Sequence, residues 1–290
     1  MKAALLPDRA AVRVEGPEAR GFLQGLVTSD MDEVGPGRAR HAALLTPQGK
    51  ILFEFMVAES GPDSVLLDVA RDKASELAKR LGFYKLRAKV EIREAGDLGI
   101  AAGWDGAPQG PGTVFPDPRL AARGFRVIAP AEALEAWLGS PAVEALEAAA
   151  YDAHRISLGV PEGGRDFPLG DSFPHEADMD QLGGVDFDKG CFVGQEVVSR
   201  MQHRGTARRR VVPVLIEGPA PAPGTEVTAG GRAVGVMGSA VAGRGLAMLR
   251  LDRVADAGGA PLEAGGARLK LVRPGWARFE VPGAEDAAVA

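Results

Sequence analysis

The spacing of apolar and polar positions along this 290-residue chain predicts a mixture of strands and helices. Apolar residues alternate or run continuously in the predicted strands, and they recur every three to four positions in the predicted helices. Because these elements do not alternate strictly as strand, helix, strand, the pattern favours an α+β fold. The strands are expected over 42–45, 51–58, 65–69, 87–93, 99–104 and 125–129, and the helices over 22–27, 72–81, 131–138, 142–158 and 193–202.

Two boundaries in this pattern carry particular expectations. Residues 46–50 (TPQGK) predict a tight turn, so the strands before and after it should form a hairpin. The helix that begins at Asp72 is expected to end at Gly82, because glycine is a common stop signal. Residues 159–188 show little periodicity and many turn formers. A loop of that length in a compact chain is more often functional than idle.

The pattern changes after Gly205. Short apolar runs, separated by glycine and proline, predict a small β-barrel or sandwich. We therefore expect two regions, 1–205 and 206–290, with the second as a separate C-terminal β-domain. The predicted strands of that domain are 210–216, 226–228, 233–240, 246–251 and 269–272.

Composition narrows the functional classes. The chain has 34 Lys and Arg against 39 Asp and Glu, a net charge of −5, so RNA contact is not expected. It has no run of the ~20 apolar residues that a membrane helix needs. Residues 1–16 lack a secretory or transit pattern, and a single cysteine fits a reducing compartment. These features predict a cytoplasmic protein.

The single cysteine, Cys191, lies in the segment KGCFVGQE at 189–196. A cysteine next to a helix start, with Lys189 two residues earlier, experiences two effects that favour the thiolate. A free cysteine is also among the most frequently buried residue types, so the pattern alone leaves a reactive and a structural thiol open.

The same segment resembles the K-G-C-[YF]-x-G-Q-E signature of the YgfZ family, folate-binding relatives of the glycine-cleavage T-protein that serve iron–sulfur cluster assembly or repair. Further blocks resemble that family in the same order along the chain. They are FLQGLVTSD at 22–30, LTPQGKI at 45–51, HRISLG at 154–159, FPHE at 173–176, and the basic continuation from Val198 to Gly205.

The resemblance implies a T-protein-like, two-lobed α+β folate-binding region with a C-terminal β-barrel. It implies tetrahydrofolate, or a related folate, in a central hole, with the acid of the P-x-E block binding the pterin. Glu176 matches that acid. A carboxylate suits a pterin because it accepts two adjacent N–H groups at once. The remaining candidate folate contacts are Arg155, Ser157, Lys189, Gln195 and Arg204.

The family comparison also predicts what the chain has lost. The aminomethyltransferases carry an essential aspartate after the hairpin turn, and here its place holds Phe53 or Glu54. Phenylalanine cannot move a proton, and a misplacement of about 1 Å can cost ~100-fold in rate. Whether the protein is an enzyme therefore stays open, although the KGC segment favours the assembly branch.

We accordingly expect a folate-binding protein that supports iron–sulfur cluster assembly or repair in client enzymes through Cys191. Its partners would be folate and iron–sulfur clients or assembly factors. The alternatives are a folate-dependent aminomethyl- or methyltransferase, and a scaffold whose thiol is only structural. A carboxylate at the aspartate's position, pointing at the folate hole, would favour the transferase. An exposed Cys191 lining the same hole would favour the assembly factor, and a fully buried one the scaffold. No resident metal site is expected, because the four histidines have no metal-binding spacing around Cys191. The basic cluster of Arg200, His203, Arg204 and 208–210 could form an anion site or a solvated helix end.

Overall fold

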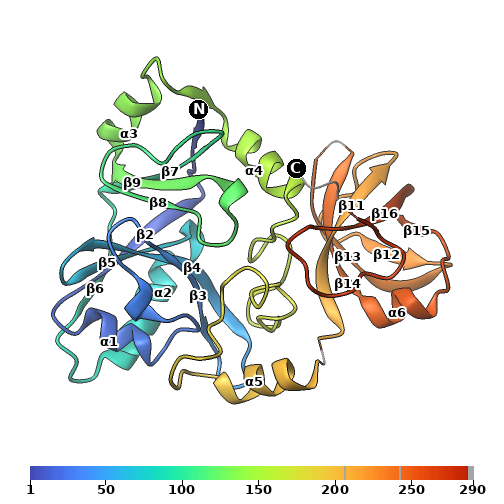
Figure 1. Cartoon of the computed structure of the whole chain (residues 1–290), viewed down its shortest axis with the longest axis horizontal. Helices are drawn as coiled ribbons and strands as arrows, with labels where there is room; N and C mark the ends of the chain where they lie inside the picture. The colour runs from blue at the N-terminus through green and yellow to red at the C-terminus, as the bar shows by residue number, and fades with distance from the viewer. Residues whose placement is uncertain (206, 242, 287–290) are drawn as a thin grey trace. The chain divides into compact units, whose positions relative to one another are not determined.

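The computed structural model describes residues 1–205, 207–241 and 243–286, and Figure 1 labels its elements. The chain divides into two compact units. Unit 1 comprises Met1–Tyr151 and Leu182–Gln195, and unit 2 comprises Asp152–Gln181 and Glu196–Ala290. Helices and both sheets of unit 1 mix without regular alternation, which confirms the α+β class. The predicted 206–290 region begins and ends on residues outside this description, and its boundary stays a prediction.

Unit 1 contains an antiparallel five-stranded sheet in the order β3-β4-β5-β2-β6. The strands are β2 (Arg9–Glu15), β3 (Arg40–Leu45), β4 (Ile51–Gly61), β5 (Ser64–Ala70) and β6 (Glu91–Glu94). The predicted hairpin is confirmed as β3–β4. Its turn is closed by the Thr46 N–H, which donates to the Lys50 carbonyl at 2.8 Å, and Gly49 adopts a φ of 80° in it. Glycine tolerates this left-handed conformation without steric cost.

Two α-helices and a short 3-10 helix accompany this sheet: α1 (Ala19–Gln24), α2 (Arg71–Lys85) and η1 (Met31–Glu33). Leu23 of α1 and Leu77 and Leu81 of α2 bury their side chains against alternate β4 residues such as Phe53. Helix α2 continues three residues beyond Gly82, so the predicted stop is wrong. Leu77 and Leu81 anchor the helix in the core, and this packing outweighs the weak helix propensity of one exposed glycine.

The second sheet of unit 1 has the order β10-β1-β7-β9-β8, with β10 parallel to β1. Its members are β1 (Lys2–Leu5), β7 (Leu98–Trp104), β8 (Thr113–Pro116), β9 (Phe125–Pro130) and β10 (Glu144–Leu146), accompanied by η2 (Ala121–Arg123) and α3 (Ala131–Leu138). Leu134 of α3 packs with Phe125 and Val127 on one face. Apolar residues of both sheets, Met56 and Ile128 among them, share a core cluster on the other face.

The predicted helix over 142–158 is wrong in its first half. Glu144–Leu146 form β10, which pairs with Lys2–Ala4 at the start of the chain, and only Ala148–Ser157 are helical, as α4. A partner more than 140 residues away decides this choice, and local periodicity cannot register it.

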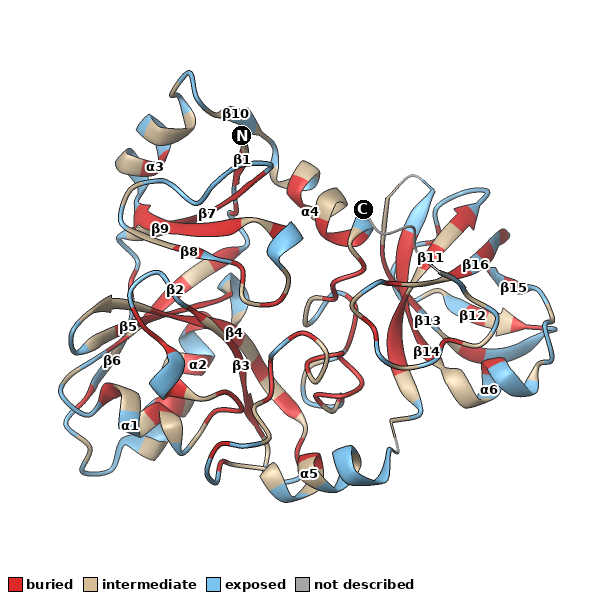
Figure 2. Cartoon of the chain, in the orientation of Figure 1, coloured by how far each residue is buried: buried red, intermediate tan, exposed pale blue. Residues whose placement is uncertain are grey.

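Unit 2 contains a closed six-stranded β-barrel in the order β11-β14-β13-β12-β15-β16, sealed by the pairing of β11 with β16. This confirms the predicted C-terminal barrel. Figure 2 shows β11 and β14 coloured mainly as buried. The elements are α5 (Gln195–Arg204), β11 (Arg209–Glu217), β12 (Glu226–Ala229), β13 (Arg232–Val241), β14 (Arg244–Arg250), α6 (Leu251–Asp256), β15 (Leu262–Ala264), β16 (Ala267–Arg273) and β17 (Glu285–Asp286).

Residues 159–181 form no helix or named strand and are organised by turns and side-chain contacts within unit 2. The Arg155 guanidinium donates to the Val160 carbonyl and to the Ser239 hydroxyl of the barrel. The Trp276 indole N–H donates to the Leu158 carbonyl at 2.9 Å. Among the described residues, no helix combines the length and apolar character needed to cross a membrane.

Candidate functional site: the KGC loop and its anchors

Residues 186–195, here called the KGC loop, are attached to unit 1 by a buried lysine. The Lys189 ammonium donates to the carbonyl oxygens of Gln24, Val27 and Ser29 at 2.8, 2.7 and 2.8 Å. These bonds use all three donors of an ammonium group. Burial lowers the pKa of Lys189 to about 8, although the acids Asp30 and Asp186 oppose the shift. Lys189 therefore anchors the loop to the FLQGLVTSD block.

A second set of bonds holds the start of the loop. The Asp186 N–H donates to the Thr28 carbonyl at 2.9 Å, and the Thr28 hydroxyl donates to the Gly184 carbonyl at 2.6 Å. The Asp186 carboxylate accepts from the N–H groups of Asp188 and Lys189, which makes a local Asx-type turn. The FLQGLVTSD and KGC blocks are therefore one hydrogen-bonded assembly.

The end of the loop packs on the β3–β4 hairpin turn. Gly194 has a φ of 80°, and a Cβ there would lie 2.5 Å from the Thr46 carbonyl oxygen and 3.0 Å from the Gly49 Cα. Only glycine fits so close to another backbone. A Cβ at Gly190, by contrast, would meet nothing within 4 Å. The two glycines that flank Cys191 thus differ: Gly194 is required by packing and Gly190 is not.

Cys191 is exposed, between the buried side chains of Lys189 and Phe192. The Lys189 ammonium lies 5.5 Å from the centre of the Phe192 ring. Helix α5 begins at Gln195, not at Val193 as predicted, because Gly194 takes a left-handed conformation. The thiol therefore precedes the helix by four residues, outside its first turn. What makes the thiol available for contact is its exposure and its position on a loop that is fixed on both sides.

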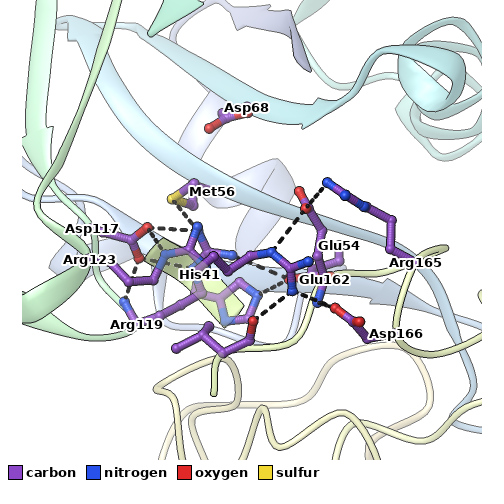
Figure 3. Close-up of polar contacts among 12 residues, drawn as sticks. His41, Glu54, Met56, Asp68, Asp117, Arg119, Arg123, Glu162, Arg165 and Asp166 are labelled. Atoms are coloured by element: carbon purple, nitrogen blue, oxygen red, sulfur yellow. Dashed lines mark hydrogen bonds and ion pairs between the residues drawn. The ribbon is translucent and has the colours of Figure 1, made fainter. Parts of the chain in front are cut away.

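Glu54 and Phe53 point to opposite faces of β4, as successive strand residues must. Phe53 is buried in the core with α1 and α2. The Glu54 carboxylate accepts a hydrogen bond from the His41 Nε2–H at 2.9 Å and lies 3.8 Å from Arg119 (Figure 3). Glu54, the candidate acid for the aspartate's place in the transferases, is therefore engaged inside unit 1.

Glu54 belongs to a larger buried charge network in the same unit (Figure 3). Asp117 pairs with Arg119 at 2.7 Å and with Arg123 at 3.0 Å. Burial opposes the ionisation of Asp117, yet these two guanidinium groups hold its pKa well below the usual range. Burial, reinforced by Arg119, lowers the pKa of Arg123. The network ties β4 to the β8–β9 connection and is a structural feature that residue spacing did not predict.

Glu176, the predicted pterin ligand, lies in unit 2 and is nearly buried. Its two carboxylate oxygens accept from the Arg209 guanidinium at 2.7 and 3.0 Å, and one also accepts from the Phe173 N–H at 3.0 Å. This bidentate geometry is the kind that was expected for a pterin. Glu176 as a folate ligand stays a prediction.

Arg210, which follows Arg209 in the sequence, is also paired with acids within the protein. It donates to Asp180 at 2.9 Å and to Asp178 at 3.3 Å. Asp178 is fully buried at a φ of 57°, and burial raises its pKa well above the usual range despite Arg210. Arg209 and Arg210 therefore bind acids of residues 171–180, which answers the open question about this part of the basic cluster.

The other predicted folate contacts fall into two groups. Arg155 is buried, and its five N–H donors are directed to Asp152, Val160, Asp166 and Ser239. Ser157 and Arg204 are exposed, and Gln195 is half-buried. Unit 1 holds Lys189, Cys191 and Gln195, and unit 2 holds Arg155, Ser157, Glu176 and Arg204. Among the described residues, no group of three or more His, Cys, Asp or Glu is placed to hold a metal ion.

Comparison with known proteins assigns this arrangement to a family. The mouse protein named iron–sulfur cluster assembly factor IBA57, mitochondrial, is 33% identical over 284 residues, which cover 86% of this chain and 77% of the mouse protein. The chain belongs to the IBA57 family. The human IBA57 is 31% identical with the same two coverages. The Mycosarcoma maydis homologue is 35% identical over 231 residues, which cover 73% of this chain and 57% of that protein.

Two further comparisons concern the fold. Residues 208–279 match the family model described as the CAF17 C-terminal beta-barrel domain. A solved glycine cleavage system aminomethyltransferase T from Bartonella henselae superposes with a TM-score of 0.75 at 18% identity, over 92% of this chain and 83% of that one. The T-protein-like fold with a C-terminal barrel is therefore confirmed. At this identity the likeness concerns the fold alone.

The comparisons also correct one expectation. The IBA57 relatives are named as mitochondrial proteins, so the predicted cytoplasmic location is wrong. That prediction used the lack of a leader pattern near residue 1 and the single cysteine. Neither feature separates the cytoplasm from another reducing compartment.

Proposed function

We propose that this IBA57-family protein supports the assembly or repair of iron–sulfur clusters in client enzymes, and that Cys191 is the thiol that does so. The observation that carries the proposal is an exposed Cys191 on a loop that the buried Lys189 fixes on one side and the tightly packed Gly194 on the other. The KGCFVGQE segment further supports a protein of the YgfZ type.

The cysteine inventory indicates how the thiol would act. A protein-bound cluster needs about four ligands, and this chain has one cysteine. Cys191 can therefore supply at most one thiolate, and the remaining ligands come from a partner protein. The role predicted is transient contact with a cluster or with the cysteines of a client, which requires an accessible thiol. A structural thiol would be expected in the interior instead.

We infer that tetrahydrofolate binds the same protein through Glu176. Each carboxylate oxygen offers about two acceptor sites, and Arg209 and the Phe173 N–H occupy three of the four. Glu176 can therefore keep both partners and still accept one pterin N–H group. Arg209 would then hold the carboxylate in place. Ser157, Gln195 and Arg204 remain candidate contacts. Arg155 and Lys189 would first have to give up the internal bonds that occupy all their donors.

The folate proposal is tested by titration calorimetry of tetrahydrofolate against the full chain. Glu176→Ala should weaken binding by about tenfold to a hundredfold, which corresponds to the loss of a charge-assisted pair. Glu263→Gln, at an exposed barrel position, is the matched control and should bind as the native protein does. Absence of binding to the native protein would refute the folate proposal and leave the thiol proposal intact.

The assembly role is tested in a strain that lacks this protein. Expression of the native chain should restore the activities of its iron–sulfur enzymes and leave cluster-free enzymes unchanged. The aminomethyltransferase alternative predicts instead that the purified chain cleaves glycine together with the other glycine-cleavage components. The engagement of Glu54 by His41 and Arg119 does not favour that outcome.

A further inference from the structure

The C-terminal end of α2 exposes two large apolar side chains that the core does not use. Phe83 is 70% exposed and Leu86 is 91% exposed. Four large apolar side chains are exposed in the described part of the chain, and these two are the most exposed of them. Exposed apolar side chains that lie close together often mark a contact surface. We call Phe83, Leu86 and the basic residues of 79–89 the α2 corner.

The backbone holds Leu86 outward in a strained conformation. Leu86 has φ 42° and ψ −103°, and the turn around it is closed by the Ala88 N–H donating to the Lys85 carbonyl at 2.7 Å. Positive φ at the first central position of such a turn is characteristic of type II′, where glycine is preferred. A leucine here gains no burial and adds strain, so folding gives no reason for it. Strain at an exposed position points to a functional contact.

The segment that carries these side chains is basic, and the Glu18 carboxylate accepts from the Lys89 N–H at 3.0 Å. Residues 79–89 (KRLGFYKLRAK) contain five basic residues and no acid, in a chain whose net charge is −5. Lys79, Lys85, Arg87 and Lys89 are exposed and Arg80 is half-buried. Throughout the described part of the chain, none of the five forms an ion pair. Lys79 and Arg80 lie one turn before Phe83 on the same helix face, so both cations flank the apolar centre.

We propose that the α2 corner docks an acidic segment of a partner protein that inserts an apolar side chain between Phe83 and Leu86. An apolar centre with a charged rim is the usual composition of a protein-binding hot spot. The fixed turn preorganises Leu86, which favours a shaped protein partner over a fluid surface. The corner lies wholly in unit 1, and its proposed contact does not involve the thiol of Cys191.

The probe is a phage-displayed library of random peptides of about 16 residues, selected on the full native chain. Phage that bind the Phe83→Ser/Leu86→Gly double variant are removed first. The selected peptides should carry net negative charge and at least one large apolar residue. Their affinity should fall at least about tenfold for Leu86→Gly and for Lys79→Glu/Lys85→Glu/Arg87→Glu, and it should weaken with added salt.

The Leu86→Gly variant separates a loss of docking from a loss of folding. Because glycine relieves the positive-φ strain, the melting temperature of this variant should not fall below that of the native chain. Val236→Thr and Arg244→Glu, at exposed barrel positions, are matched controls and should keep full binding. Neutral or basic selected peptides, or none that discriminate the double variant, would overturn the proposal. The proposal would also be overturned if the native chain, but not the Leu86→Gly variant, floated with vesicles containing about 30% phosphatidylserine. That result would identify the α2 corner as a membrane-binding surface.

Discussion

Replacing Lys189 by methionine removes two opposing contributions to stability at the base of the KGC loop, namely three hydrogen bonds and a buried positive charge. Methionine keeps an unbranched side chain of similar length but donates no hydrogen bond. Three carbonyl oxygens, those of Gln24, Val27 and Ser29, lose their donor. At about 1 kcal/mol for each buried acceptor, the loss is about 3 kcal/mol.

The opposing contribution is the removal of a buried charge. Burial lowers the pKa of Lys189 from 10.5 to about 8, and at about 1.4 kcal/mol per pH unit the charged form is disfavoured in the fold by about 3 kcal/mol. The two contributions nearly offset each other. We therefore expect Lys189→Met to change the free energy of unfolding at pH 7 by about 1 kcal/mol or less.

The distinguishing signal is the pH dependence. Between pH 8 and 10.5 the unfolded chain still holds the Lys189 proton and the folded chain has released it, so stability rises with pH in this window. Relative to Lys189→Met, the native protein should gain about 2 kcal/mol between pH 7 and pH 10, with some reduction for solvent screening. Urea unfolding of both proteins, followed by tryptophan fluorescence, measures this difference. A difference that stays constant with pH would refute the buried-ammonium account.

Two further predictions use other anchors of the site. Gly194→Ala should destabilise the protein by about 2 kcal/mol or more, because the added Cβ would meet the Thr46 carbonyl. Gly190→Ala should melt as the native chain does, since a Cβ there meets nothing within 4 Å. Equal melting temperatures for the two variants would contradict this packing. Asp178→Asn should raise the melting temperature at pH 7, with the gain shrinking toward pH 4. The native carboxyl stays protonated above its unfolded pKa, so its contribution to stability falls as pH rises, and a gain independent of pH would show that Asp178 is charged in the fold.

Local patterns predicted those elements whose partners are close in sequence. The TPQGK turn and the alternation on either side of it contain the information for the β3–β4 hairpin. The short apolar runs separated by glycine and proline after residue 205 likewise predicted the barrel. They did not predict α6 and β15, which lie in an Ala- and Gly-rich stretch. Where a distant strand decided the conformation, as β1 does for Glu144–Leu146, the helical pattern was misleading.

The candidate site divides in the same way. The residues of the KGC loop could be singled out from sequence, because a lone cysteine between glycines is a local signal. The partner of Lys189 could not, since Gln24 lies 165 residues away. The same holds for Glu176, whose bidentate partner Arg209 was visible only as one member of a basic cluster. Pairing of charges is a property of the fold, and composition reveals only that the charges exist.

The proposed role of the Cys191 thiol in iron–sulfur cluster assembly can be tested by complementation. Cys191→Ala is expressed in a strain that lacks this protein, beside the native chain and Gly190→Ala. Cys191→Ala removes one exposed sulfur atom, so it should accumulate and melt as the native protein does. The proposed role predicts that Gly190→Ala restores the iron–sulfur enzyme activities and Cys191→Ala does not. Full restoration by Cys191→Ala would contradict it.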